Sequence, residues 1–338
     1  TTASGLSPVS EPIILSPLPT TLKAQCMRLK DLKNTYYIPG TALNPIEDAA
    51  KRVLHRSVPV FPRTIQLQTQ TGCNARCVFC PYKDTYDKVP KGKMSDALFR
   101  KIVDEIAQHN ATRRVSPYLM NEPFLDAGLV DKARYIKRYV RGGRVVVTTN
   151  AGPLTPDVVD DIMGDNPFRS IYISMHGIDK GPYEATMGGT LVLEETKRHV
   201  EYLIEQRNKH RPDLEIVVTM IKTAAIDAEA AVRYWKSLGV SSKFTLLENR
   251  GGNLSQEDFE RLNTGEKRVF AHCPRLFKQG YILFDGTMVL CCTDYLRTMV
   301  LGNVAESSIY EVWNAPRAVE IRRSFIRGDF SDNPLCAQ

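Results

Sequence analysis

Three cysteines lie within eight residues of the chain and could together bind a metal centre. The segment that holds them reads Thr71-Gly-Cys-Asn-Ala-Arg-Cys-Val-Phe-Cys-Pro-Tyr82 and contains Cys73, Cys77 and Cys80. Thiolates select zinc, copper(I) or iron–sulfur clusters. Structural zinc takes a fourth protein ligand, usually from a second Cys-x-x-Cys pair, and the sequence after Cys80 contains none. A cubane cluster on three thiolates instead leaves one iron open to a small-molecule chelate. We therefore favour an iron–sulfur cluster over a zinc knuckle.

The other cysteines are unevenly spaced, and their distribution bears on the compartment. Four of them, Cys273, Cys291, Cys292 and Cys336, lie near the C-terminal end, and Cys26 stands alone and is expected to be inert. Disulfide frameworks belong to short, Cys-dense secreted chains, whereas this chain has eight cysteines in 338 residues. Thiols that bind metal or do chemistry indicate an intracellular protein, so we expect a cytoplasmic location.

Length and composition exclude several classes of protein. The chain has 338 residues, 43% of them hydrophobic and 25% charged, which suits one large α/β barrel or two average domains. No apolar run approaches the roughly 20 residues that span a bilayer, and residues 1–22 lack the pattern of a secretion signal. The net charge of +7 is spread along the chain. We therefore expect neither a membrane nor a nucleic-acid partner.

Strand patterns alternate with helix patterns from Thr64 onward. Short apolar runs predict strands, and apolar residues repeated every three to four positions predict helices. The predicted strands are Ile65–Thr69, Val115–Met120, Arg144–Thr149, Ser170–Met175, Glu215–Ile221 and Lys243–Leu247. The predicted helices are one capped by Ser95, then Asp126–Val140, Thr155–Met163, Leu191–Asn208 and Asp227–Leu238.

This alternation predicts the fold class and the edge at which the site lies. Six strands joined by helices require right-handed crossovers and a parallel sheet, which curls into a partial (β/α)6 barrel. In such barrels function lies at the carboxyl ends of the strands. The unusual residues fall there: the three cysteines, Asn121-Glu122-Pro123, Asn150, His176 and Lys222 follow the first five strands in order.

The pattern divides the chain into three parts. Residues 1–62 form a Pro-rich leader with a helix predicted over Pro45–Leu54, residues 63–248 form the barrel, and residues 249–338 form a Cys-bearing module. Within that module, Tyr281–Leu290 contains an Asp-Gly pair and predicts a hairpin.

The first cysteine motif resembles the signature of the radical S-adenosylmethionine (SAM) enzymes. The shared pattern is Cys-x-x-x-Cys-x-aromatic-Cys after the first strand of a partial barrel, and the likeness covers about residues 64 to 248. The resemblance implies a [4Fe-4S] cluster on Cys73, Cys77 and Cys80, with SAM chelating the open iron. Its one-electron reduction would cleave SAM to a 5′-deoxyadenosyl radical that abstracts hydrogen from the substrate.

The same resemblance implies a set of SAM-binding residues. Asn121 and Glu122 correspond to the Gly-Gly-Glu segment that binds the SAM amino group, although glycine is replaced, and a structural turn is the alternative. Ser174 resembles the ribose-contacting serine of the fourth strand. Asn150 closes a Thr-Thr-Asn run like that of the third strand, and Phe79 and Tyr82 flank the cluster and could touch adenine or simply pack.

The C-terminal cysteines resemble the auxiliary-cluster region of the SPASM and twitch subfamily. Cys273 is followed by twelve residues, Gly286, four residues and Cys291, and a 44-residue gap then leads to Cys336. The likeness implies one auxiliary [4Fe-4S] cluster, or two, on Cys273, Cys291 and Cys336, with zinc as the alternative. The fourth ligand would lie beyond Gln338, or Cys292 or the substrate would fill its place.

For the reaction and the substrate, the sequence predicts a class but not an individual compound. The subfamily oxidises or epimerises carbohydrate and aminocyclitol centres, or modifies ribosomal peptides. The leader is short and Pro-rich, so we favour a polyhydroxylated small molecule of natural-product (antibiotic) biosynthesis, with dehydrogenation and epimerisation both open. Dehydrogenation needs a base, for which His176 or Glu248 are candidates, although His176 could equally be structural. Epimerisation could use Cys292 as a hydrogen-atom donor, with a small buried thiol as the alternative.

Two other roles remain as alternatives, and one partner is implied. A peptide or protein maturase would bind a leader peptide, and an iron–sulfur or zinc regulator would bind nucleic acid in a salt-dependent way. A radical SAM enzyme also needs an electron donor such as flavodoxin or ferredoxin.

Overall fold

The barrel strands form one side of a continuous sheet. The computed structural model describes residues 58–223, 226–265 and 273–337, so the predicted helix Pro45–Leu54 and Cys26 lie outside the described residues. The strands run in the order β6-β5-β4-β3-β2-β1-β7-β8-β9. The first six are parallel, and they are β1 (Thr64–Leu67), β2 (Arg114–Ser116), β3 (Arg144–Thr149), β4 (Ser170–Ser174), β5 (Glu215–Lys222) and β6 (Ser241–Leu246). All six predicted strands are present, and the partial barrel is confirmed.

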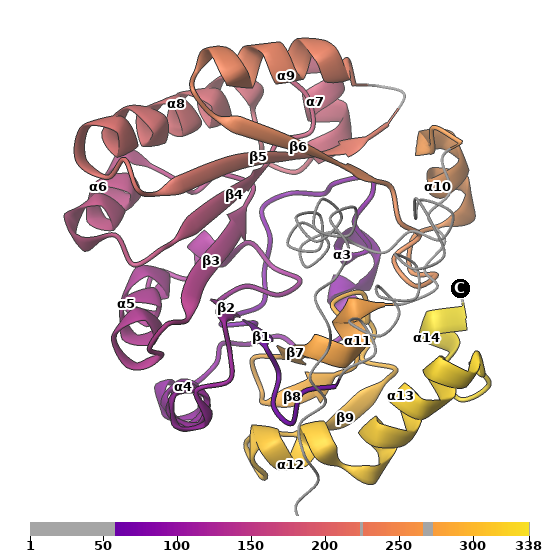
Figure 1. The fold of residues 1–338 in the computed structure, drawn as a ribbon. Helices are drawn as coiled ribbons and strands as arrows, with labels where there is room; N and C mark the ends of the chain where they lie inside the picture. The colour runs from indigo at the N-terminus through magenta and orange to yellow at the C-terminus, as the bar shows by residue number, and fades with distance from the viewer. Residues whose placement is uncertain (1–57, 224–225, 266–272, 338) are drawn as a thin grey trace, which may run out of the picture.

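Helices cover the outer face of this curved sheet (Figure 1). They are α4 (Asp96–His109), α5 (Leu129–Tyr139), α6 (Pro156–Asp165), α8 (Leu193–His210) and α9 (Ala228–Ser237). Ser95 caps α4 as predicted, since its hydroxyl accepts a hydrogen bond from the Leu98 amide at 3.2 Å. A further helix, α7 (Lys180–Met187), follows β4 and was not predicted. No helix in the described ranges is long and apolar enough to cross a bilayer.

The C-terminal module extends the barrel sheet. The predicted hairpin is present as β7 (Gln279–Ile282) and β8 (Thr287–Val289), and β9 (Val300–Asn303) follows. β7 pairs in parallel with β1, with Ile65 opposite Gly280. The helices of the module are α10 (Gln256–Leu262), α11 (Pro274–Lys278), α12 (Ile309–Asn314), α13 (Pro316–Arg327) and α14 (Pro334–Ala337). The pairing places the module beside the strand that leads into the first cysteine motif.

Two side chains on α4 fix the module to the barrel. The Lys101 ammonium donates to the carbonyls of Val304, Ala305 and Ser307 at 2.8, 2.9 and 3.1 Å. One turn along the helix, the Glu105 carboxylate accepts hydrogen bonds from the first two amides of α12 at 2.8 and 2.9 Å. These amides lack partners within their own helix, so Glu105 serves as a cap supplied by another element.

Candidate active site

The three cysteines of the first motif converge in the loop after β1. Gly72 begins this loop with φ of +125°, a conformation that favours glycine. The Cys80 amide donates to the Cys77 carbonyl at 3.0 Å, which closes a turn between two of the thiols. Burial raises the pKa of Cys77 well above its usual value, and the nearby Cys80 and Cys73 thiols raise it further. The three thiols therefore lie near enough to influence one another's ionisation, and all three residues are partly accessible.

Glu122 holds the loop from one side. Its amide donates to the Gly72 carbonyl at 2.8 Å, and its carboxylate accepts from the Thr149 hydroxyl at 2.7 Å and from the Asn150 amide at 2.7 Å. The Phe124 amide donates to the same carboxylate at 3.2 Å. The side chain is buried, and burial raises its pKa to about 7. Glu122 thus joins the ends of β2 and β3 to the cysteine loop.

Asn150 ties the end of β3 directly to the same loop. Its side-chain nitrogen donates to Asn74 Oδ1 at 2.7 Å and lies 3.9 Å from the Cys73 sulfur. Its side-chain oxygen accepts from the Gly152 amide at 2.9 Å, so the orientation of the amide group is fixed. Asn150, predicted from the sequence as part of the site, is therefore in contact with the cysteine loop.

Gly188 and Gly189, which follow α7, lie against the other side of the loop. This contact was not predicted from the sequence. The Thr190 amide donates to the Asn74 carbonyl and the Arg76 amide donates to the Met187 carbonyl, both at 3.0 Å. A Cβ at Gly189 would lie 2.2 Å from the Asn74 carbonyl oxygen, where φ is +72°. Only glycine allows this approach. The pair of adjacent glycines was the one feature of the sequence that could have indicated this close approach.

Asn121 presents a buried donor that no atom of the described residues satisfies. Its side-chain oxygen accepts from the Leu119 amide at 2.9 Å, whereas its side-chain nitrogen is buried without a partner in that part of the chain. Met120, just before it, has a φ of +53°. Unpartnered buried polar atoms are rare and often belong to binding sites. A carboxylate-bearing ligand at this turn would satisfy the amide.

These residues fit an iron–sulfur cluster with a chelated SAM. The loop supplies three soft sulfur ligands, and Asn121, directly before the Glu122 whose amide bonds to Gly72, supplies a hydrogen-bond donor. In a four-iron cluster each thiolate binds its own iron, which differs from three ligands around one ion. Across residues 58–223, 226–265 and 273–337, no three His, Cys, Asp or Glu side chains are grouped as ligands of a single metal ion.

His176 and Phe79 pack against one another beside the loop. Their rings are 4.3 Å apart and nearly perpendicular. His176 Nδ1 accepts a hydrogen bond from the Ile221 amide at 2.9 Å, and burial together with the nearby Arg250 lowers the pKa of the imidazole to about 3. The ring is therefore neutral, and Nδ1 is already engaged. This geometry favours the structural alternative for His176.

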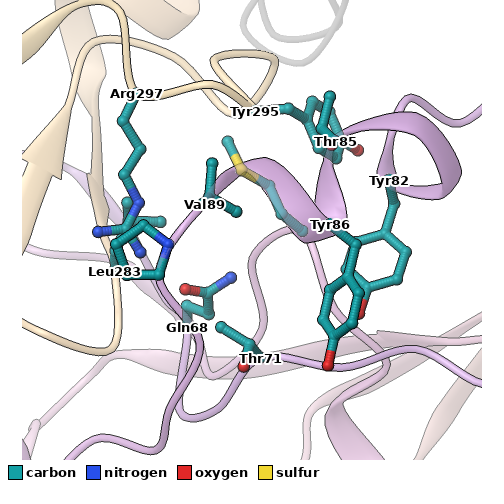
Figure 2. A pocket seen from close by; sticks show the side chains of 11 residues that line it. Gln68, Thr71, Tyr82, Thr85, Tyr86, Val89, Leu283, Tyr295 and Arg297 are labelled. Atoms are coloured by element: carbon teal, nitrogen blue, oxygen red, sulfur yellow. The ribbon is translucent and has the colours of Figure 1, made fainter.

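Tyr82 lines a small pocket next to the loop (Figure 2). Its ring lies 5.0 Å from that of Tyr86, and the side chains of Tyr295 and Arg297 reach the pocket from the C-terminal module. The volume is about 20 Å³, room for roughly one water molecule. Ser174, predicted to contact the ribose, ends β4 with a half-buried side chain. The roles of Tyr82, Ser174 and Phe79 toward SAM stay predictions.

The structure brings the three distant cysteines of the second motif to one apolar cluster. Cys273, Cys291 and Cys336 all pack against the group that contains Phe277 and Phe325. Burial raises the pKa of Cys336 to about 11, and the neighbouring Cys273 contributes to the same shift. These contacts support a shared site, whose ligand set stays a prediction.

Cys292 faces a different cluster from its neighbour. It packs against the group that contains Leu119 and Tyr281, and it lies beyond the end of β8 rather than within a strand. The two adjacent thiols act on one another: Cys292 lowers the pKa of Cys291, and Cys291 raises the pKa of Cys292 well above its usual value. Cys292 is thus on the barrel side of the second cysteine group.

Glu248, the other predicted base, belongs to a group of charges between the two cysteine sites. Its two carboxylate oxygens accept from Arg275 at 3.0 Å each, and Arg250 lies 4.0 Å away. Arg250 has a φ of +57°, and its Nε atom is buried without a hydrogen-bond partner among the residues that the structure describes. Neither arginine was predicted from the sequence.

Comparisons with known proteins agree with this geometry. The radical SAM superfamily profile matches residues 67–223, and the SPASM iron–sulfur cluster-binding domain matches residues 273–338. A cofactor-modifying protein for tungsten-containing aldehyde ferredoxin oxidoreductase from Pyrococcus furiosus is 25% identical, over 75% of this chain and 81% of that protein. The SAM-dependent 2-deoxy-scyllo-inosamine dehydrogenase of Niallia circulans is 20% identical, over 80% and 90% respectively.

A solved structure shares the fold. The crystal structure of BtrN in complex with AdoMet and 2-DOIA superposes with a TM-score of 0.58 at 17% identity, and the match covers 83% of this chain and 93% of that one. The two family matches confirm the resemblance predicted from the cysteine motifs. The chain belongs to the radical SAM superfamily and is an enzyme that uses SAM and iron–sulfur clusters, with a SPASM domain at its C-terminal end.

Proposed function

We propose that this enzyme oxidises a hydroxyl-bearing carbon of a small polyhydroxylated substrate, of the sugar or aminocyclitol type, to a ketone. The observation that carries the proposal is the similarity to 2-deoxy-scyllo-inosamine dehydrogenase, which extends over 80% of this chain and 90% of that enzyme. The pocket that Tyr82, just after the cysteine loop, shares with Tyr295 and Arg297 of the SPASM domain supports it, because an electron acceptor must lie near the reacting carbon. Natural-product biosynthesis is the proposed setting.

Oxidation of the alcohol requires the loss of one hydrogen atom, one electron and one proton. SAM and the clusters, when bound, supply hydrogen abstraction and electron uptake. This chain must supply the proton acceptor. We assign that role to Glu248, because its carboxylate is the acidic group that Arg275 holds at 3.0 Å, close to the SPASM cysteines. His176 is excluded from the proposal because its Nδ1 atom accepts from the backbone.

Epimerisation is the second candidate, and the position of Cys292 favours it. The thiol packs on the barrel side of the second cysteine group, against the cluster that includes Leu119. A hydrogen atom returned from this thiol would invert a carbon centre without net oxidation of the substrate. The thiyl radical left on Cys292 would then take one electron from the external reductant and one proton to restore the thiol. Under the dehydrogenase proposal, a Cys292→Ala variant keeps its product and its rate within about twofold. Loss of turnover in that variant, with an epimer formed by the wild type, would favour epimerisation.

Product analysis tests the proposal directly. Reconstituted enzyme is incubated anaerobically with SAM, a reductant and a panel of aminocyclitols and sugars that includes 2-deoxy-scyllo-inosamine. We expect at least one of them to stimulate 5′-deoxyadenosine release, with one ketone formed per 5′-deoxyadenosine. Stimulation by peptides alone would overturn the proposal and favour a peptide maturase.

We also propose flavodoxin or ferredoxin as the natural reductant. We propose the cytoplasm as the location, since all seven described cysteines are unpaired.

A further inference from the structure

One side chain of the SPASM domain reaches the third cysteine of the radical SAM motif. The Tyr295 hydroxyl lies 3.6 Å from the Cys80 sulfur, within hydrogen-bonding distance for a sulfur atom. Figure 2 shows Tyr295 extending from the loop of the C-terminal module toward helix α3 (Tyr82–Thr85), which begins just after Cys80. Tyr295 is far from Cys80 in sequence, so the contact exists only because the module folds against the barrel.

The loop that carries Tyr295 is fixed in place. Asp294 is fully buried, and its carboxylate accepts from the Thr298 amide, the Thr298 hydroxyl and the Met299 amide, each at 2.8 Å. The Asn253 side chain donates to the Thr293 carbonyl at 2.9 Å and links the loop to the end of the barrel. The hydroxyl is therefore presented to Cys80 by a braced backbone rather than by a free side chain.

The same loop begins at the second cysteine site. Cys291, a predicted ligand of the auxiliary cluster, lies four residues before Tyr295, and the Asp294 amide donates to the Cys291 carbonyl at 3.1 Å. One short, ordered segment therefore connects the two cysteine groups. Hydrogen bonds to the sulfurs of an iron–sulfur cluster are one of the means by which a protein sets its reduction potential.

We propose that Tyr295 is a positioning residue that donates a hydrogen bond to the Cys80 thiolate in the loaded enzyme and raises the reduction potential of the SAM-binding cluster. A thiolate ligand has no proton, so the phenol is the only possible donor in this pair. Reduction adds negative charge to the cluster, and a donor stabilises the more negative state. The inference rests on membership of the radical SAM superfamily and is independent of the substrate proposed above.

A potential measurement on matched variants tests this. Tyr295→Phe keeps the ring and removes only the hydroxyl, and Tyr234→Phe is the control, because its hydroxyl bonds to Glu201 on the exposed outside of the barrel. Both are reconstituted anaerobically and titrated while the reduced clusters are followed by electron paramagnetic resonance. A variant with Cys73, Cys77 and Cys80 all changed to Ala identifies the auxiliary signal.

We expect Tyr295→Phe to keep its iron and to lower the equilibrium constant for reduction of the SAM-binding cluster about tenfold, which for one electron is about 59 mV. The auxiliary cluster and the Tyr234→Phe protein keep the wild-type potentials. An unchanged potential in Tyr295→Phe would overturn the proposal. So would an equal shift of both clusters, or loss of iron from the SAM-binding site, since either shows a general structural role. None of these outcomes depends on finding the substrate.

Discussion

Single residues at the site combine burial with polar partners that decide their protonation, and Glu122 is the clearest case. Its carboxylate is buried and accepts three hydrogen bonds, yet burial outweighs them and raises its pKa to about 7. An acid whose pKa is raised on folding stabilises the protein below its ordinary pKa, and this contribution is lost as pH rises through the folded value. The contribution of Glu122 should therefore make the free energy of unfolding lower near neutral pH than at acidic pH.

The direction of this pH dependence can be measured on cluster-free protein. From the shift between the ordinary value of 4.5 and about 7, the free energy of unfolding should fall by about 3 kcal/mol between pH 4.5 and 8. Glu122→Gln cannot ionise, so this component of the slope should be absent. Urea unfolding across this range gives the comparison, with Glu205→Gln on the surface as control. An unchanged slope in Glu122→Gln would contradict the assignment.

At the scale of elements, the conformation of Gly286 explains why a glycine lies between Cys273 and Cys291 in the second cysteine motif. Gly286 lies between Cys273 and Cys291 in the hairpin turn, with φ of +85°. A Cβ there would lie 2.5 Å from Asn303 Oδ1 and 3.0 Å from the Ala305 amide. The turn therefore needs glycine both for its backbone conformation and for the close approach of the end of β9.

A Gly286→Ala variant should distort this turn and with it the position of Cys291. We expect a loss of about 2 kcal/mol or more in the free energy of unfolding and loss of iron from the auxiliary site. Gly142→Ala is the matched control, because Gly142 also has a positive φ, +69°, but nothing lies within 4 Å of its Cβ position. If both variants lose the same stability and keep their iron, the close approach at Gly286 is unimportant.

The attachment of the C-terminal module to α4 gives a second prediction at this scale. Lys101→Met removes three hydrogen bonds to carbonyls, and Glu105→Ala removes the cap of α12, so each should lower the free energy of unfolding by about 1 kcal/mol or more. The exposed pair of Lys209 and Glu205 is expected to contribute almost nothing, which makes Lys209→Met the control. Urea midpoints for the two α4 variants that equal that of Lys209→Met would refute this role.

At the scale of the whole molecule, the local patterns predicted the barrel, whereas contacts between distant segments were missed. Each strand from β1 to β6 is a short apolar run that can be read by itself. The parallel pairing of β1 with β7 joins residues more than 200 positions apart and leaves no local signal. The same holds for the bond between Tyr295 and Cys80 and for the contact between Gly189 and Asn74, which are properties of the folded chain.

The site was predictable where residue type alone determines chemistry. Three thiols at short spacing indicate a soft metal centre in any fold, and Asn150 followed from its place after a strand. His176 shows the limit, because only the structure reveals that Nδ1 accepts the Ile221 amide. The arginines beside Glu248 were missed because surface and buried arginines look alike in a sequence.

The central claim is that this molecule holds a SAM-binding cluster and an independent auxiliary cluster. Anaerobic iron quantification of the reconstituted wild type, and of a variant with Cys73, Cys77 and Cys80 all changed to Ala, tests it most directly. Two [4Fe-4S] clusters predict about 8 irons per chain in the wild type and about 4 in the variant, which should also release no 5′-deoxyadenosine from SAM. Zinc without iron in the wild type, or a variant that keeps all its iron, would contradict the account.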